Sequence, residues 1–166
     1  MFVTTMRAGV RGTLAAAVLA AALAASAPVV AENPAPYPGT QVVATGHAFE
    51  TLWDRLKKAI KANKMGIVAQ ACASCGAKNR GVTIPGNAVV MAYRNDFAVR
   101  MLAASVAAGI EAPLRFYVTE NADGKATLTY RMPSAVFAPY GNADLDAMAR
   151  ELDAIWERIV RDTVGG

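Results

Sequence analysis

The cysteine pair in Cys72-Ala73-Ser74-Cys75 is the part of this sequence whose residue types and spacing point most directly to chemistry. Two thiols separated by two residues can form an inert disulfide, exchange electrons or sulfur as a dithiol, or bind a metal ion. Lys78 and Arg80 follow closely, and their positive charges would lower the pKa of either thiol. A disulfide here closes a very short loop and stabilises the fold little, which argues against a purely structural role.

The neighbours of the pair exclude several cofactor sites. Covalent c-type haem needs a histidine directly after the second cysteine, where this chain has Gly76. The glycines also predict a loop over 76–86, whereas a thioredoxin fold begins a helix at its cysteine pair. Zinc takes four ligands, and one chain offers Cys72, Cys75 and at best His47, although two copies could supply four sulfurs. We therefore expect neither a bound metal nor a cofactor.

Three further side chains are candidates for binding. His47 is the only histidine and precedes an expected helix, where a capping or surface role is commoner than a catalytic one. Arg115 and Tyr117 alternate with apolar residues on an expected strand, and together with Arg131 they could line a groove. Polar strand residues of this kind more often face solvent, and the sequence favours that interpretation. The chain has no Ser-His-Asp order and no phosphate-binding glycine loop.

The first 31 residues have the features of a secretory signal peptide. An n-region with two arginines precedes the apolar residues 13–25, and the small residues 29–31 offer a cleavage site before Glu32. The alternative is an uncleaved membrane anchor, but the stretch is short for a span, mostly alanine, and broken by Pro28. We predict cleavage of residues 1–31 and export to the periplasm, with no membrane span in the mature chain.

The mature chain is expected to be one domain with little net charge. The full sequence has 54% hydrophobic and 18% charged residues, which excludes disorder over most of its length. Residues 32–40 contain three prolines and predict an extended leader, followed by a domain over 41–166. The net charge is +4, and signal cleavage removes two arginines. The basic residues near Lys57 share one expected helix face, which indicates a solvated surface rather than nucleic-acid binding.

Strand and helix patterns alternate along this domain. Apolar residues recur every three or four positions in the helices and every second position in the strands, and Asp123-Gly124 predicts a hairpin turn. The expected strands cover 41–45, 67–71, 87–93, 114–120 and 126–132, and the expected helices cover 49–65, 96–108 and 143–164. The order β-α-β-β-α-β-β-α predicts a compact α+β domain, with about three helices packed on a mixed or antiparallel sheet.

The apolar stripes of the helices predict which side chains form the core. Trp53 and Trp156 lie on the stripes of the first and last helices, and we expect both to be buried. The stripe of the middle helix predicts burial of Phe97, Met101, Leu102, Ser105 and Val106.

A set of short motifs gives the chain a resemblance to a known family. They are Phe49-x-x-Leu52, Gly66-Ile67-Val68, Arg94-Asn95-Asp96, the strand segment 112–118, the hairpin 120–125 and Tyr130-x-x-Pro133-Ser134. In this order and spacing they resemble the domain of unknown function 302 family over about residues 42–163. The resemblance implies a compact α+β domain, often dimeric, with no established activity and no catalytic residue to carry over. Many members have a histidine near the position of Cys75, and this chain departs from them there.

Two classes of function follow from the sequence. It favours an exported, non-catalytic binding or interaction module, whose partner is a small ligand or a periplasmic protein and which could act as a homodimer. The alternative is a thiol-based redox or sulfur-transfer protein that uses Cys72 and Cys75. The sequence does not identify a reaction.

Overall fold

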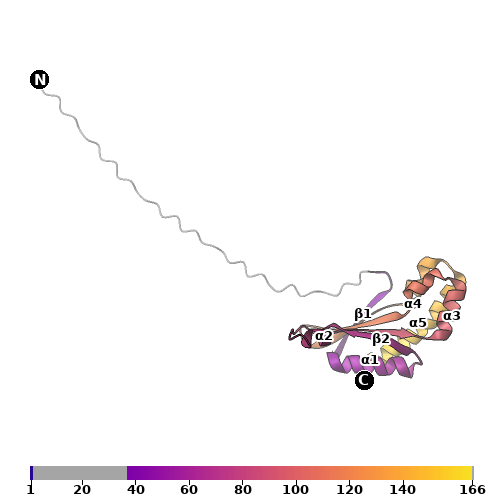
Figure 1. Ribbon diagram of the computed structural model, residues 1–166, viewed down its shortest axis with the longest axis horizontal. Helices are drawn as coiled ribbons and strands as arrows, with labels where there is room; N and C mark the ends of the chain where they lie inside the picture. Colours follow the sequence, from indigo (N-terminus) through magenta and orange to yellow (C-terminus); the bar gives the residue numbers. More distant parts are fainter. Residues whose placement is uncertain (2–36, 166) are drawn as a thin grey trace. The chain divides into compact units, whose positions relative to one another are not determined.

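Five strands form one sheet in the computed structural model, which describes Met1 and residues 37–165 (Figure 1). The strands are β1 (Thr40–Ala48), β2 (Gly66–Cys72), β3 (Asn87–Tyr93), β4 (Leu114–Glu120) and β5 (Lys125–Arg131). They lie in the order β1-β5-β4-β3-β2, and every neighbouring pair is antiparallel. The expected signal peptide, apart from Met1, and most of the expected leader lie outside the described residues.

Helices cover one face of this sheet. The two long helices, α1 (Phe49–Ala62) and α5 (Ala143–Val164), lie together against it (Figure 1). The shorter helices are α2 (Ala73–Lys78), α3 (Asn95–Ala104) and α4 (Pro133–Phe137), with 3-10 turns η1 (Ala107–Glu111) and η2 (Ala138–Tyr140). The predicted α+β class is confirmed, and the sheet is antiparallel.

The two faces of the sheet differ in burial because side chains alternate along each strand. In β4, Phe116 and Val118 point to the helices and are fully buried, whereas Arg115 is exposed and Tyr117 is half-buried. The register pairs Tyr117 with Thr129 of β5 and with Val89 of β3, so these three side chains share the second face. That face carries the polar residues of the central strands.

Both tryptophans are in the core, as predicted. Trp53 is 8% exposed and Trp156 is fully buried. The Trp156 ring stacks on Phe116 of β4, with ring centroids 5.1 Å apart and planes 20° apart. The contact fixes α5 against the middle of the sheet.

The predicted middle helix is too long. It ends at Ala104 because the backbone of Ser105 is extended, and the Ser105 hydroxyl instead accepts the N–H of Ala108 at the start of η1. Phe97 and Met101 are buried as expected, but Leu102 is 46% exposed and Val106 is 79% exposed. The Ser105 hydroxyl therefore takes a backbone N–H that a longer helix would have used, and the buried face of α3 ends before Ser105.

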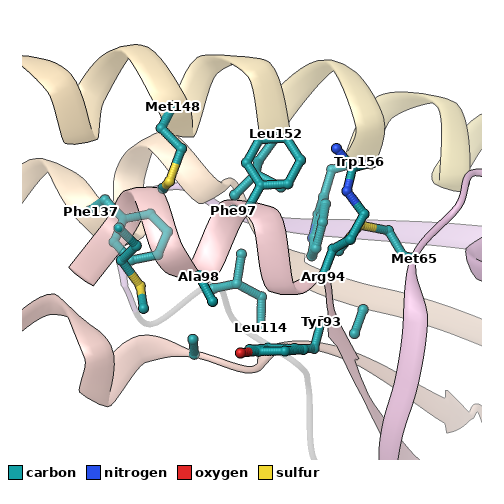
Figure 2. Close-up of a pocket in the computed structure, with 13 residues that line it drawn as sticks. Met65, Tyr93, Arg94, Phe97, Ala98, Leu114, Phe137, Met148, Leu152 and Trp156 are labelled. Atoms are coloured by element: carbon teal, nitrogen blue, oxygen red, sulfur yellow. The ribbon is translucent and has the colours of Figure 1, made fainter. Parts of the chain in front are cut away.

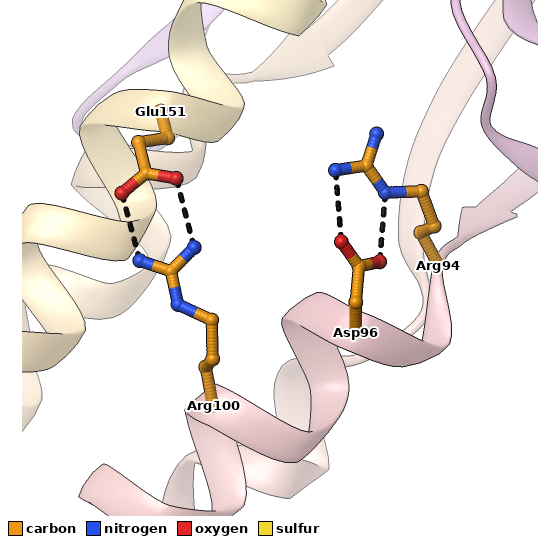
Figure 3. Close-up of polar contacts among 4 residues, drawn as sticks. All are labelled: Arg94, Asp96, Arg100 and Glu151. Carbon is orange, nitrogen blue, oxygen red and sulfur yellow. Dashed lines mark hydrogen bonds and ion pairs between the residues drawn. The ribbon is translucent and has the colours of Figure 1, made fainter.

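Two arginine–carboxylate pairs involve α3 (Figure 3). Arg100 donates two hydrogen bonds to Glu151 of α5, at 2.7 and 2.8 Å, and Arg94 donates two to Asp96, at 2.7 and 3.0 Å. Hydrogen bonds from the arginines lower the pKa of Glu151 and of Asp96. The Arg100–Glu151 pair joins α3 to α5, whereas Arg94 and Asp96 lie within one turn. Because the pairs are at least partly exposed to solvent, both add little to the free energy of unfolding.

Candidate functional site

One small pocket lies at the edge of the core, between α3, α5 and the sheet (Figure 2). Its volume is about 30 Å³, and its walls are mostly apolar side chains such as Phe97, Met148 and Trp156. The Trp156 Nε1 atom is buried and has no hydrogen-bond partner among the described residues. A space of this size holds no more than water, so it is a packing defect of the core and not a ligand site.

A larger pocket of about 240 Å³ opens at one end of the sheet. Here β1 and β4 begin and β5 ends, because β5 lies between them and runs antiparallel to both. The pocket is lined by residues of these strands and by the segments that lead into them and out of them: Tyr37, Thr40, Glu111, Pro113, Leu114, Arg115, Tyr117, Thr129, Tyr130, Arg131 and Val136. We call it the sheet-end pocket.

Two arginines on neighbouring strands line the sheet-end pocket. Phe116 pairs with Tyr130 and Tyr117 pairs with Thr129, so the same register places Arg115 opposite Arg131 on the second face. Within residues 37–165 neither guanidinium forms an ion pair with an acidic side chain. Like charges that face each other on neighbouring strands repel, so this arrangement is costly unless an anion lies between them.

Polar atoms that lack partners are concentrated in the same pocket. Four buried side-chain nitrogen or oxygen atoms of the described residues have no hydrogen-bond partner, and three of them line it: Thr40 Oγ1, Thr129 Oγ1 and Arg131 Nε. Buried polar groups are nearly always hydrogen-bonded, and each exception calls for an explanation. Unsatisfied polar groups of the described residues are therefore concentrated in the residues that line the sheet-end pocket.

Aromatic side chains and one carboxylate complete the walls. The Arg131 guanidinium lies over the ring of Tyr37, 5.7 Å from its centroid. Glu111 accepts a hydrogen bond of 3.2 Å from the Tyr140 hydroxyl, and burial followed by this bond raises the pKa of Tyr140. Burial also raises the pKa of Tyr130. The phenols therefore stay protonated at neutral pH and can act as hydrogen-bond donors.

The cysteine pair forms a second site, at the far end of β2 from Gly66. Cys72 and Cys75 are joined as a disulfide, and their Cα atoms are 5.2 Å apart. The sequence predicted a loop over 76–86. The loop begins later, after Lys78, because α2 starts directly after Cys72, whose sulfur accepts the N–H of Cys75 as the helix cap. Gly76 therefore lies within α2, whereas Gly81 and Gly86 lie in the loop that follows it.

The remaining candidates lie elsewhere. His47 is half-buried near the end of β1, its N–H donates to Thr45 Oγ1, and it lines neither the sheet-end pocket nor the groove beside Cys75. In the described part of the chain, no three His, Cys, Asp or Glu residues gather as metal ligands would. None of the helices in that part is long and apolar enough to cross a membrane.

Sequence patterns identified part of the sheet-end pocket. Arg115, Tyr117 and Arg131 lie together in it, along the groove that the sequence allowed but did not favour. Thr40, Thr129 and Tyr37 were not among the candidates. Only the pairing of β1 with β5 brings Thr40 and the preceding Tyr37 to the arginines. The alternation along β5 places Thr129 and Arg131 on one face, and that signal could have identified Thr129.

Comparison with known proteins identifies a similar solved structure and a family to which the chain belongs. A solved structure described as an uncharacterized conserved protein DUF302 from Bacillus stearothermophilus matches with a TM-score of 0.63 and 14% sequence identity. The match covers 76% of this chain and 96% of the other. Comparison with curated protein sequences gives no significant match. The family model for the domain of unknown function DUF302 matches residues 41–162, and the chain therefore belongs to this family.

Proposed function

We propose that this protein is a binding module that holds a small anionic molecule in the sheet-end pocket. The observation that carries the proposal is the juxtaposition of Arg115 and Arg131 on one face of the sheet, where neither forms an ion pair within residues 37–165. Three buried polar atoms that lack partners among the described residues belong to residues of the same pocket. The family has no established activity, so the proposal rests on this chain's own residues.

The chemistry of the pocket favours a carboxylate attached to an apolar body. Arginine binds carboxylates through planar, charge-assisted hydrogen bonds, and an anion between Arg115 and Arg131 would cancel their repulsion. The hydroxyls of Thr40 and Thr129 can donate to the same group. Leu114, Pro113 and the tyrosine rings offer apolar contact. A volume of about 240 Å³ lies below the usual range of drug-sized ligand pockets, so the ligand is small.

The test compares three probes of one shape and different charge: benzoate, benzamide and benzylamine. We expect backbone amide NMR signals of Thr129, Arg131 and their neighbours to shift with benzoate, and to shift less with the neutral and cationic probes. Arg131→Met should weaken benzoate binding about tenfold or more, the effect of losing a charged hydrogen-bond donor.

Arg150→Met is the matched control, because Arg150 is exposed on α5 and lines no part of the pocket. It removes the same charge from the chain and should leave benzoate binding unchanged. Equal binding of the three probes, or equal loss in the two variants, would contradict the proposal.

We also propose that the protein acts in the periplasm after removal of residues 1–31. The support is the order of n-region, apolar segment and small residues at the start of the sequence. The intact mass of the protein recovered from the exported fraction should correspond to a chain that begins at or near Glu32. A full-length protein that remains bound to the membrane would be inconsistent with this.

A further inference from the structure

The two sulfur atoms of the disulfide have different surroundings. Cys75 is exposed on the first turn of α2, whereas Cys72 is half-buried at the end of β2. Cys75 borders a groove of about 520 Å³, together with Ser74, Lys78 and the loop that contains Val82 and Ile84. A thiol from solution can therefore approach Cys75 more easily than Cys72.

Hydrogen-bond donors surround the sulfur of Cys72. The N–H of Cys75 donates to Cys72 Sγ at 3.1 Å, and the Ser74 hydroxyl lies 3.5 Å from the same atom. Ser74 Oγ already accepts the N–H of Asn87 at 3.1 Å, so its proton is directed to Cys72 Sγ. No described hydrogen bond reaches Cys75 Sγ. The described hydrogen bonds would therefore stabilise a negative charge on Cys72 Sγ and not on Cys75 Sγ.

The exposure of Cys75 and the hydrogen bonds to Cys72 together favour attack of an external thiolate on Cys75. Thiol–disulfide exchange is fastest when the attacked sulfur is accessible and the leaving sulfur is stabilised as a thiolate. Cys75 meets the first condition and Cys72 meets the second. Lys78 of the same groove adds a positive charge that attracts an incoming thiolate.

We propose that the protein undergoes thiol–disulfide exchange with a dithiol, and that Cys75 is the sulfur attacked. The thiolate of the dithiol forms a bond to Cys75 Sγ, the Cys72–Cys75 bond breaks, and its electron pair leaves on Cys72 Sγ. The second thiolate of the dithiol then attacks the dithiol sulfur that is bonded to Cys75. The bond to Cys75 Sγ breaks, and Cys75 leaves as a thiolate. Both cysteines end as thiols after protonation, and the dithiol, which has given up two electrons, ends as a disulfide.

The test uses reduced glutathione as a single-thiol probe on the folded, oxidised protein. After brief exposure and an acid quench, free thiols are alkylated and the mixed disulfide is located by peptide mapping. We expect the glutathione adduct on Cys75 to exceed that on Cys72 about tenfold or more, because leaving-group stability and access act together. A dominant adduct on Cys72, equal adducts, or no reaction with either glutathione or dithiothreitol would overturn the proposal.

Single-cysteine variants test the origin of the asymmetry. Cys75→Ser keeps the backbone N–H that donates to Cys72, so the thiol pKa of Cys72 in that variant should be lower than that of Cys75 in Cys72→Ser. Ser74→Ala should raise the pKa of Cys72 and slow the exchange several-fold. Thr83→Ala, an exposed change in the same groove, is the matched control and should alter neither quantity.

Folding and ligand binding can be separated from this activity. A disulfide that closes so short a loop adds only about 2 kcal/mol by the chain-entropy relation, so the reduced protein and the cysteine variants should remain folded by circular dichroism. Benzoate binds at a different site under the proposed function. The benzoate experiment can therefore contradict the binding proposal, and the glutathione experiment can contradict the exchange proposal, each independently of the other.

Discussion

Replacing Trp156 by Ala should lower the free energy of unfolding by about 3–5 kcal/mol, as for other large core aromatics. Trp156 is fully buried, stacks on Phe116 of β4 and lies on α5, which packs beside α1. Its removal leaves a cavity between α5 and β4, and the existing space of about 30 Å³ beside it would become part of that cavity. Guanidinium denaturation of the oxidised protein measures the loss.

Trp156→Phe is the informative control. The indole Nε1 atom is buried without a hydrogen-bond partner among the described residues, so phenylalanine removes an unsatisfied donor while it keeps most of the ring stacking. We expect this variant to lose clearly less stability than Trp156→Ala. A loss below about 1 kcal/mol for the alanine variant would mean that the side chain is not a core residue.

Replacing Gly86 by Ala should cost about 1–3 kcal/mol, through overpacking and not through a cavity. A Cβ atom at this position would lie 2.6 Å from Cδ2 and 2.7 Å from Cδ1 of Phe49, whose ring is buried at the start of α1. The backbone of Gly86 cannot move away freely, because its N–H donates to the Glu120 carboxylate and its carbonyl accepts the Glu120 N–H. Thermal or chemical denaturation gives the magnitude.

A second glycine separates this contact from the general effect of alanine. Gly76 lies in α2, and a Cβ atom there meets nothing within 4 Å. Gly76→Ala should therefore leave stability unchanged or raise it by up to about 1 kcal/mol through helix propensity. Gly86→Ala should also become nearly neutral when Phe49 is replaced by Ala. If the cost persists in that background, the Phe49 ring is not its cause.

The elements that follow strong periodicity were predictable from the sequence. The hairpin at Asp123-Gly124, the two long helices and the burial of both tryptophans depend on local patterns that the fold reinforces. The errors occur where one side chain overrides the pattern. Ser105 accepts a backbone N–H and ends α3, and the sulfur of Cys72 caps α2 in a stretch whose glycines suggested a loop.

The sheet-end pocket was less predictable, for a topological reason. Alternation along β4 placed Arg115 and Tyr117 on one face, but it gives no information about which strand lies beside them. The long-range pairing of β1 with β5 determines which hydroxyls and rings surround the arginines. Register between distant strands is a property of the whole sheet, and a single sequence contains no local signal for it.

That same pairing has a consequence for how the chain acquires its structure. β1 is the first described strand of the sheet to be synthesised, yet β5, with which it pairs, comes more than 70 residues later. Closing so long a loop costs about 2.5 kcal/mol more in chain entropy than closing the short turn between β4 and β5. We expect the β2-β3-β4-β5 ladder to form from near neighbours in the sequence and β1 to dock on it last. Until it docks, β5 is an open edge strand, and a chain that has not yet closed its sheet presents that edge to other chains.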